Sequence, residues 1–263
     1  MTTPPPPRPV KAVLFDLDGT LLDTERLSDR AMFDALQDHI APSVLAQAAD
    51  HDYLLPWSLK RQILGKRGAE WAPMVLDYAK KHWELDSNNT RLQPSQLWSA
   101  WEHCLDRLGP QVQACDGAPE LVQALHQHSH NLPLAIATSS RATAVQHKRQ
   151  NHESTLFQYM TTIVTGEQVT HGKPAPDMYL EAAQRVGVAP SDCLVFEDAL
   201  AGVQSAKAAG CRVVAVPDVR FTAEERWVFD DLADVVLSSL WEFDGRLFGL
   251  EGVVLEKKEE EYN

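Results

Sequence analysis

The chain has 263 residues, of which 44% are hydrophobic and 23% are charged, as is usual for a globular protein with one large domain or a core and a smaller domain. Its 24 basic and 37 acidic residues give a formal net charge of −13, which argues against a nucleic-acid partner because phosphate backbones bind basic surfaces. The sequence has no run of about 18 apolar residues and no CxxC pair among its four cysteines, so we expect no membrane span, no disulfide framework and no structural zinc.

The predicted elements begin after a proline-rich start, MTTPPPPRPV, in which we expect residues 1–9 to form a disordered leader. Short apolar segments then predict strands buried on both faces, at residues 10–18, 132–138, 162–165, 193–197 and 213–216. Amphipathic stretches such as PDMYLEAAQRVG lie between these segments and predict helices. The alternation predicts an α/β fold with a doubly wound, Rossmann-like parallel sheet. The charged end, 251–263, predicts a solvated tail.

The interval between the first two strands breaks the alternation, because residues 23–110 show helical patterns and no convincing strand. We therefore expect a small all-helical domain at 23–110, inserted into a core domain formed by 10–22 and 111–250. This insert contains most of the tryptophans. They can pack the interior of a small helical bundle or, alternatively, form a platform on which a base stacks, and packing is the more general use of large aromatic side chains.

Polar side chains follow the predicted strands at the points where the strands end. In an open parallel sheet, these carboxyl ends lie at one edge, where ligands bind. A lysine in the segment HGKPAPD, where a loop opens a helix, can reach the same edge. Each residue alone has an ordinary explanation, since hydroxyls and acids often cap helices and a single lysine is usually solvated. The candidate site residues are Asp16, Asp18, Thr138, Ser139, Lys173, Glu197 and Asp198.

Taken together, these side chains favour phosphoryl transfer. Asp16 can attack phosphorus and form an aspartyl-phosphate, which divides one difficult step into two. Its charge would repel a phosphate dianion unless a hard cation such as Mg²⁺, held by Asp16 and Asp198 with Glu197, neutralises it. Because side chains alternate along a strand, Asp18 lies on the same side as Asp16 and can act as general acid and base.

The same edge offers groups that bind phosphate oxygens. Lys173 can neutralise charge on the phosphate and on the nucleophile, and Thr138 can donate its hydroxyl. The amides that follow, from Ser139 onward, lie at a predicted helix N-terminus and suit the remaining oxygens. Such a pocket is locally positive even on an acidic protein, so we expect a small phosphorylated metabolite as the partner.

Four segments in this order, DLDGT, IATSS, GKPAPD and VFEDALAG, resemble the four motifs of the haloacid dehalogenase-like hydrolases. The resemblance extends from about residue 10 to about residue 250. It implies that Asp16 is the nucleophile and Asp18 the general acid and base. It also implies that Thr138 and Lys173 bind phosphate. Asp198 and Glu197, with the backbone carbonyl of Asp18, would hold Mg²⁺.

The helical insert resembles the C1 cap of this family, a lid that closes over the phosphate site. Segments such as LGKRGAEWAPMVLD and CLVFEDALAGVQSAKAAGCRVVAVPD further resemble the branch of pseudouridine-5'-phosphatases and glycerol-phosphate phosphatases. In the relatives, an LGK or MGK turn of the cap faces the site. By this resemblance, Lys66 or Arg67 contacts the leaving group of the substrate; the alternative is a solvated basic turn between two helices.

The sequence therefore predicts a Mg²⁺-dependent phosphatase for a phosphorylated sugar, polyol or nucleoside. A phosphomutase of the β-phosphoglucomutase type has the same catalytic set and remains an alternative. A non-catalytic phosphate-binding protein is a third possibility, although such a protein has no need of Asp18. We also expect a cytoplasmic monomer that binds neither nucleic acid nor membrane.

Overall fold

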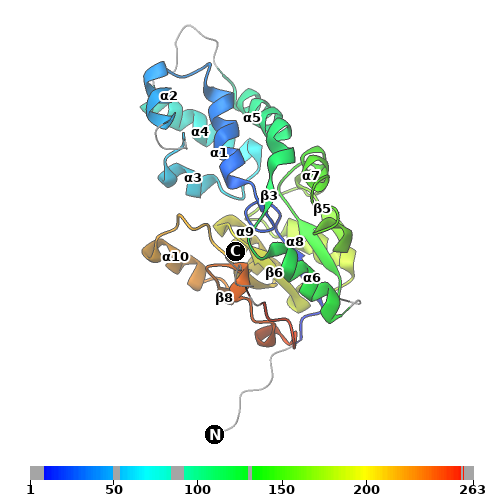
Figure 1. Ribbon diagram of the computed structural model, residues 1–263. Helices are drawn as coiled ribbons and strands as arrows, with labels where there is room; N and C mark the ends of the chain where they lie inside the picture. The colour runs from blue at the N-terminus through cyan, green and yellow to red at the C-terminus, as the bar shows by residue number, and fades with distance from the viewer. Residues whose placement is uncertain (1–8, 50–53, 84–91, 130–131, 256, 258–263) are drawn as a thin grey trace, which may run out of the picture.

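The structure, a computed structural model, describes residues 9–49, 54–83, 92–129, 132–255 and 257. Figure 1 shows a group of helices, drawn in blue to teal, above a second part that contains the sheet. The predicted leader lies outside the described residues except for Pro9, as does the end of the predicted tail. Within the described ranges, no helix is both long and apolar enough to span a bilayer.

Six parallel strands form one sheet among the described residues, in the order β5-β4-β1-β6-β7-β8. Their bounds are Ala12–Phe15 (β1), Leu134–Ala137 (β4), Met160–Val164 (β5), Cys193–Glu197 (β6), Arg212–Ala215 (β7) and Val235–Val236 (β8). At the centre, Leu14 of β1 lies opposite Ala135 of β4 and Val195 of β6. The doubly wound parallel sheet is thus confirmed, although β1 is shorter than predicted and β8 is too short to show a pattern in the sequence.

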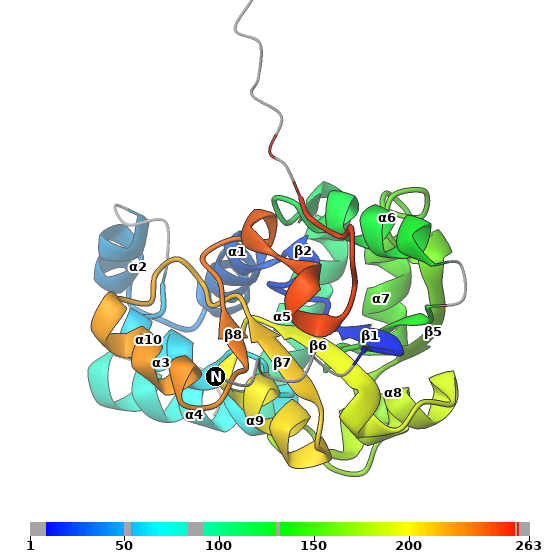
Figure 2. The ribbon, with the colours of Figure 1, turned by 90° about the horizontal axis from the view of Figure 1, so that it is seen from below.

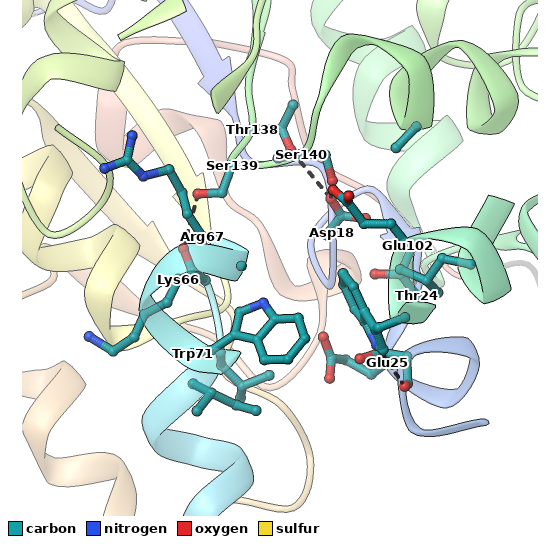
Figure 3. A pocket seen from close by; sticks show the side chains of 18 of the residues that line it. Asp18, Thr24, Glu25, Lys66, Arg67, Trp71, Glu102, Thr138, Ser139 and Ser140 are labelled. Carbon is teal, nitrogen blue, oxygen red and sulfur yellow. Dashed lines mark hydrogen bonds between the residues drawn. The ribbon is translucent and has the colours of Figure 1, made fainter. Parts of the chain in front are cut away.

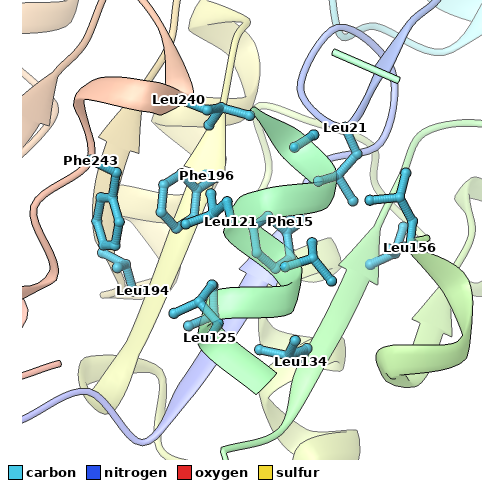
Figure 4. Close-up of a cluster of buried hydrophobic side chains, with 14 of the residues drawn as sticks. Phe15, Leu21, Leu121, Leu125, Leu134, Leu156, Leu194, Phe196, Leu240 and Phe243 are labelled. Atoms are coloured by element: carbon cyan, nitrogen blue, oxygen red, sulfur yellow. The ribbon is translucent and has the colours of Figure 1, made fainter. Parts of the chain in front are cut away.

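Side chains of the central strands alternate between two apolar layers, as expected for a sheet buried on both faces. Val13 and Phe15 of β1 belong to one layer, whereas Ala12 and Leu14 belong to the other. Figure 4 shows the first layer, in which Phe15 lies beside Leu121 of α6. Figure 2 shows helices on both faces of the sheet. The helices are α6 (Ala118–His128) and α7 (Ala142–Arg149) on the Phe15 side, and α8 (Asp177–Val186), α9 (Leu200–Ala209) and α10 (Ala223–Asp230) on the Leu14 side.

The helical insert has its own apolar interior. Its helices are α1 (Glu25–Leu36), α2 (Pro42–Ala49), α3 (Trp57–Ile63), α4 (Gly68–His82) and α5 (Pro94–Leu108). Trp71 and Trp83 are buried in this interior, and Trp98 and Trp101 pack partly buried against it. Trp57 differs, because its ring meets Phe221 of the sheet-containing part edge-on at 4.9 Å. Trp71, Trp83, Trp98 and Trp101 therefore help to fill the interior of the insert, as the packing interpretation expects.

A short antiparallel ladder joins the two parts. In it, β2 (Leu22–Asp23) pairs with β3 (Gln113–Ala114), so that the chain leaves and re-enters the sheet-containing part at adjacent positions. A further hydrogen bond from the Cys115 amide to the carbonyl of Leu21, 2.9 Å long, extends the ladder. The sequence does not reveal these two-residue strands, because they are shorter than any period that a pattern could show.

Candidate active site

The predicted strand-end residues meet at one edge of the sheet. Asp16 follows β1, Thr138 follows β4, and Glu197 is the last residue of β6, which puts them on adjacent parallel strands. Lys173, in the loop before α8, reaches into this edge and is only 1% exposed. Its ammonium group pairs with Asp16, lies 2.7 Å from Glu197 Oε1 and donates to the carbonyl of Ala137 at 3.2 Å.

Three buried carboxylates crowd this edge. Asp16, Glu197 and Asp198 each offer a carboxylate oxygen, and these oxygens lie within 4.8 Å of one another. Burial raises the pKa of Asp16 to about 7, because the attraction of Lys173 only partly offsets burial and the charges of Glu197 and Asp18 oppose ionisation further. Burial and the neighbouring acids also raise the pKa of Asp198 well above its ordinary value. One lysine does not balance three acids, so the donor set fits a divalent cation.

Two glycines make this crowding possible. Gly19 has a φ of +91°, and a Cβ there would lie 2.3 Å from Asp198 Oδ2. A Cβ at Gly202 in α9 would lie 1.7 Å from Glu197 Oε1. The segments DLDGT and EDALAG therefore place glycine where a carboxylate of the cluster passes close to the backbone. Thr20 adds a hydrogen bond from its hydroxyl to Asp198 Oδ1 at 3.2 Å.

Asp18 lies beside this cluster and has partners of its own. Its Oδ2 accepts hydrogen bonds from the hydroxyls of Ser140 at 2.7 Å and Thr138 at 3.3 Å, as Figure 3 shows for part of this group. Its Oδ1 pairs with the ammonium group of Lys148 in α7. Burial acts to raise the pKa of Asp18, but the charge and hydrogen bonds of Lys148, with those of Ser140 and Thr24, outweigh it and lower the pKa.

The remaining predicted residues lie where the helical insert meets the sheet edge. The Ser139 hydroxyl donates to the carbonyl of Gly65 at 3.0 Å, and the Arg67 guanidinium donates to the carbonyl of Thr170 at 3.4 Å. In Figure 3, the side chains of Lys66 and Arg67 point away from Asp18. The structure thus gathers the acids, Thr138 and Lys173, and it places the turn at residues 65–67 against the loops that carry them.

A cavity between the helical insert and the strand ends opens beside Asp18. Trp71, Trp98 and Trp101 form aromatic walls, and the rings of Trp71 and Trp101 meet edge-on at 5.0 Å. Across the cavity, Arg141 pairs with Glu102 of α5 at 2.9 Å, and its guanidinium lies 4.0 Å from the ring centre of Trp98. This cavity has room and chemistry for a group attached to a phosphate at the strand ends.

The sequence does not predict three residues that lie at this site, namely Lys148, Tyr179 and Glu102. Tyr179, which is fully buried in α8, donates its hydroxyl at 2.5 Å to Glu197 Oε1, the oxygen that also accepts from Lys173. Lys148 and Tyr179 stand in helices that directly follow the motif segments, one at the end of α7 and one in the first turn of α8. The closeness of these helices to the motif segments is the only indication in the sequence. It does not show which side chains of the helices point toward the site.

Comparison with known proteins agrees with this geometry. A model of the haloacid dehalogenase-like hydrolases matches residues 10–210. The probable pseudouridine-5'-phosphatase of Drosophila melanogaster is 34% identical over 247 residues, which cover 92% of this chain and 95% of that protein. The (DL)-glycerol-3-phosphatase 2 of Arabidopsis thaliana is 34% identical over 243 residues, or 90% of each chain. Among solved structures, CbbY from Rhodobacter sphaeroides in complex with phosphate has a TM-score of 0.67 at 24% identity and covers 88% of this chain and 95% of its own. The chain belongs to the haloacid dehalogenase-like hydrolase family.

Proposed function

We propose that this protein is a Mg²⁺-dependent phosphatase that hydrolyses a small phosphorylated metabolite through an aspartyl-phosphate. The observation that carries the proposal is the buried Asp16 at the end of β1, paired with Lys173 and within 4.8 Å of two further acids. A buried acid cluster with one cation is costly for the fold, and a divalent metal with a phosphate ligand explains it. Membership of a hydrolase family supports the same reading.

The proposed reaction has two steps. In the first, an Asp16 carboxylate oxygen bonds to phosphorus, the bond from phosphorus to the leaving oxygen breaks, and Asp18 gives that oxygen a proton. In the second, a water oxygen bonds to phosphorus, its proton passes to Asp18, and the Asp16–phosphorus bond breaks. The lowered pKa of Asp18 means that its carboxyl group is ionised before substrate binds. It must therefore take up a proton first, and the negative charge of a nearby phosphate dianion favours this protonation.

The other residues have supporting roles in this proposal. Lys173 and the hydroxyl of Thr138, with the amide or hydroxyl of Ser139, would bind the phosphate oxygens. Asp16, Asp198, Glu197 and the backbone carbonyl of Asp18 would hold Mg²⁺, which supplies charge neutralisation at the carboxylates and the phosphate. These assignments rest on the contacts described above and on the motif resemblance.

The substrate would be a monophosphate of a sugar, polyol or nucleoside. Of the relatives described above, one is named a probable pseudouridine-5'-phosphatase and another a (DL)-glycerol-3-phosphatase. The cavity beside Asp18 supports this class of substrate. The faces of its tryptophans can pack against a sugar or base ring, and the side chains of Glu25 and Ser28 can form hydrogen bonds with hydroxyl groups of the substrate. We propose that residues 23–110 form the lid that selects the leaving group, and that 10–22 with 111–250 form the core that does the chemistry.

A phosphatase assay tests the proposal directly. The purified chain should release phosphate from p-nitrophenyl phosphate with Mg²⁺ and should lose this activity after exhaustive EDTA treatment. A panel of sugar, polyol and nucleoside monophosphates then identifies the substrate. Full activity in EDTA would contradict the metal assignment, isomerisation of a sugar phosphate without phosphate release would favour the mutase, and inactivity on every ester would favour a phosphate-binding protein.

Two further properties remain predictions from the sequence, namely a monomeric state and a cytoplasmic location. Light scattering on the eluting protein tests the first, since a dimer would double the mass of 29.3 kDa expected for one chain. Imaging of a carboxyl-terminally tagged chain, which leaves the proline-rich start free, tests the second.

A further inference from the structure

Lys148 is a buried cation that the strand-end motifs do not include. It belongs to the last turn of α7, yet its side chain is only 7% exposed and its ammonium group reaches back to Asp18. Burying a lysine is costly unless a partner compensates its charge. Its polar partners in the described structure are the Oδ1 of Asp18 and, at 3.1 Å, the hydroxyl of Ser140. The fold therefore places this charge against one particular carboxylate.

Both oxygens of Asp18 are occupied as a result. Lys148 takes Oδ1, while the hydroxyls of Ser140 and Thr138 donate to Oδ2 at 2.7 Å and 3.3 Å. Ser140 is itself fixed, because its amide donates to the Thr138 hydroxyl at 3.0 Å and its own hydroxyl accepts from Lys148. A carboxylate held at both oxygens cannot rotate about its terminal bond, so these contacts define where it points.

Asp18 needs such a restraint more than the other acids do. Its side chain is 26% exposed, against 8% for Asp16 and 1% for Glu197. It also lies close to Asp16, whose negative charge would repel a free carboxylate. When a phosphate takes the hydroxyl of Thr138, Lys148, Ser140 and the hydroxyl of Thr24 remain to hold Asp18, and Lys148 is the one of these three that carries a charge.

We propose that Lys148 is a positioning residue, which together with Ser140 aims the Asp18 carboxylate at the leaving oxygen. This inference rests on the proposed phosphatase function. It differs from a direct role in binding phosphate, because Lys148 would act only through Asp18. The effect of removing it should therefore depend on how much the leaving group needs a proton.

Two aryl esters of similar size separate these roles. The leaving group of p-nitrophenyl phosphate departs readily as an anion, whereas phenol is about as basic as a tyrosine side chain, with a pKa near 10, and benefits from the proton of Asp18. In the full chain with Mg²⁺, Lys148→Met should lower kcat/KM for phenyl phosphate by about 100-fold and for p-nitrophenyl phosphate by less than about fivefold. Vanadate, a phosphate analogue, should inhibit the variant as strongly as the wild type.

Control variants test whether a loss of activity in Lys148→Met comes from misfolding. Arg149→Met removes the adjacent cation of α7, which pairs with Glu153 on the surface, and should change neither ester. Ser140→Ala should act in the same direction as Lys148→Met with a smaller difference between esters, and Lys148→Arg should recover part of the loss on phenyl phosphate. The thermal midpoint reports whether each variant is folded.

The outcomes separate the inference from the proposed function. Equal losses on both esters, weaker vanadate inhibition or no loss at all would overturn the positioning role while leaving the phosphatase assignment intact. Failure of the wild type to hydrolyse either ester, or any other monoester of the panel, would overturn the proposed function and this inference with it.

Discussion

Among the described residues, one buried and one partly buried cluster of three acids each differ in how their charge is compensated. The strand-end cluster consists of Asp16, Glu197 and Asp198 with Lys173. The interface cluster, between the helical insert and the loop after β7, consists of Glu25, Asp29 and Asp218 with Lys60 and Arg220.

In the interface cluster, every acid has a basic partner. Lys60 lies 3.0 Å from Glu25 and 2.8 Å from Asp29, and Arg220 lies 3.1 Å from Asp29 and 2.7 Å from Asp218. In the strand-end cluster, within the part of the chain that the structure describes, Lys173 is the one basic side chain paired with the acids. In the interface cluster, the acids and bases neutralise one another and hold two parts of the fold together. In the strand-end cluster, the excess negative charge indicates a binding site for a cation.

The largest effect should come from neutralising the nucleophile in the unbalanced cluster. Asp16→Asn should abolish turnover, because an amide cannot attack phosphorus, and should leave the thermal midpoint unchanged or higher because it removes a buried charge. Phosphate release and thermal unfolding measure the two effects. Loss of a covalent nucleophile typically costs several orders of magnitude, so residual activity above about 1% would refute the assignment.

The two clusters should also respond to pH in opposite directions in metal-free protein. The pKa of Asp16 is raised to about 7, so its contribution to stability is present below its ordinary value near 4 and is lost as pH rises through about 7. For Asp218, burial acts to raise the pKa, but hydrogen bonds and charge from Arg220 lower it, so its contribution is lost as pH falls below its ordinary value.

Urea unfolding in EDTA between pH 5 and pH 8 measures the first of these responses. The free energy of unfolding should fall over this range in the wild type, and Asp16→Asn should flatten the decline. Added Mg²⁺ should stabilise the wild type more at pH 8 than at pH 5, because protons compete with the metal for the same oxygens. Identical slopes for the two proteins would show that Asp16 is not the group responsible.

Disrupting the interface cluster should lower the free energy of unfolding more than it lowers catalytic activity. Lys60→Met removes one of the two cations that contact both Glu25 and Asp29 and leaves only Arg220 to both, so it should lower the free energy of unfolding by about 2 kcal/mol. Lys80→Met is the control, because this lysine is 61% exposed and its pair with Asp77 is 3.9 Å long, so the change should stay within about 0.5 kcal/mol. Equal stability of the two variants would contradict a structural role for the interface cluster.

The smallest effect should come from the turn between α3 and α4. Arg67→Ala removes a contact with the carbonyl of Thr170, in the loop that leads to Lys173, and should lower kcat/KM by about threefold on every ester. A loss of about tenfold, or on the order of 1.4 kcal/mol, that is confined to sugar or polyol monophosphates would instead support the substrate contact predicted for Lys66 or Arg67. Steady-state kinetics on an aryl and an alkyl ester distinguish the two results.

The sequence predicts the strand-end cluster well because local rules place it. A short apolar run identifies each strand, and the residue that follows the run must lie at the carboxyl edge of a parallel sheet. Asp16, Glu197 and Asp198 are all found in this way, as is Thr138 beside the cluster. The alternation of strands and helices predicts the helical insert by the same logic, since the insert is where the alternation stops.

Other features depend on contacts between distant segments, which no local rule supplies. Lys148 and Tyr179 reach the site from helices, and their inward direction follows from how α7 and α8 pack on the sheet. The interface cluster joins Lys60 to Arg220 through acids of α1, and each of these residues looks like an ordinary surface charge in the sequence. Trp57 likewise packs on Phe221 rather than within the insert where the sequence places it.

The paired strands β2 and β3 have a consequence for the architecture as a whole. Leu22 lies opposite Ala114, and Asp23 lies opposite Gln113. The helical insert, a long excursion of the chain between β2 and β3, therefore begins and ends at neighbouring positions, as the loop of a hairpin does. The entropy of closing that loop is largely set by these neighbouring ends and depends only weakly on the length of the chain between them. A change in the length of the excursion should therefore alter the entropy of closing it only slightly, whereas the contacts of Asp29 and Gly65 with the sheet-containing part limit which excursions fit.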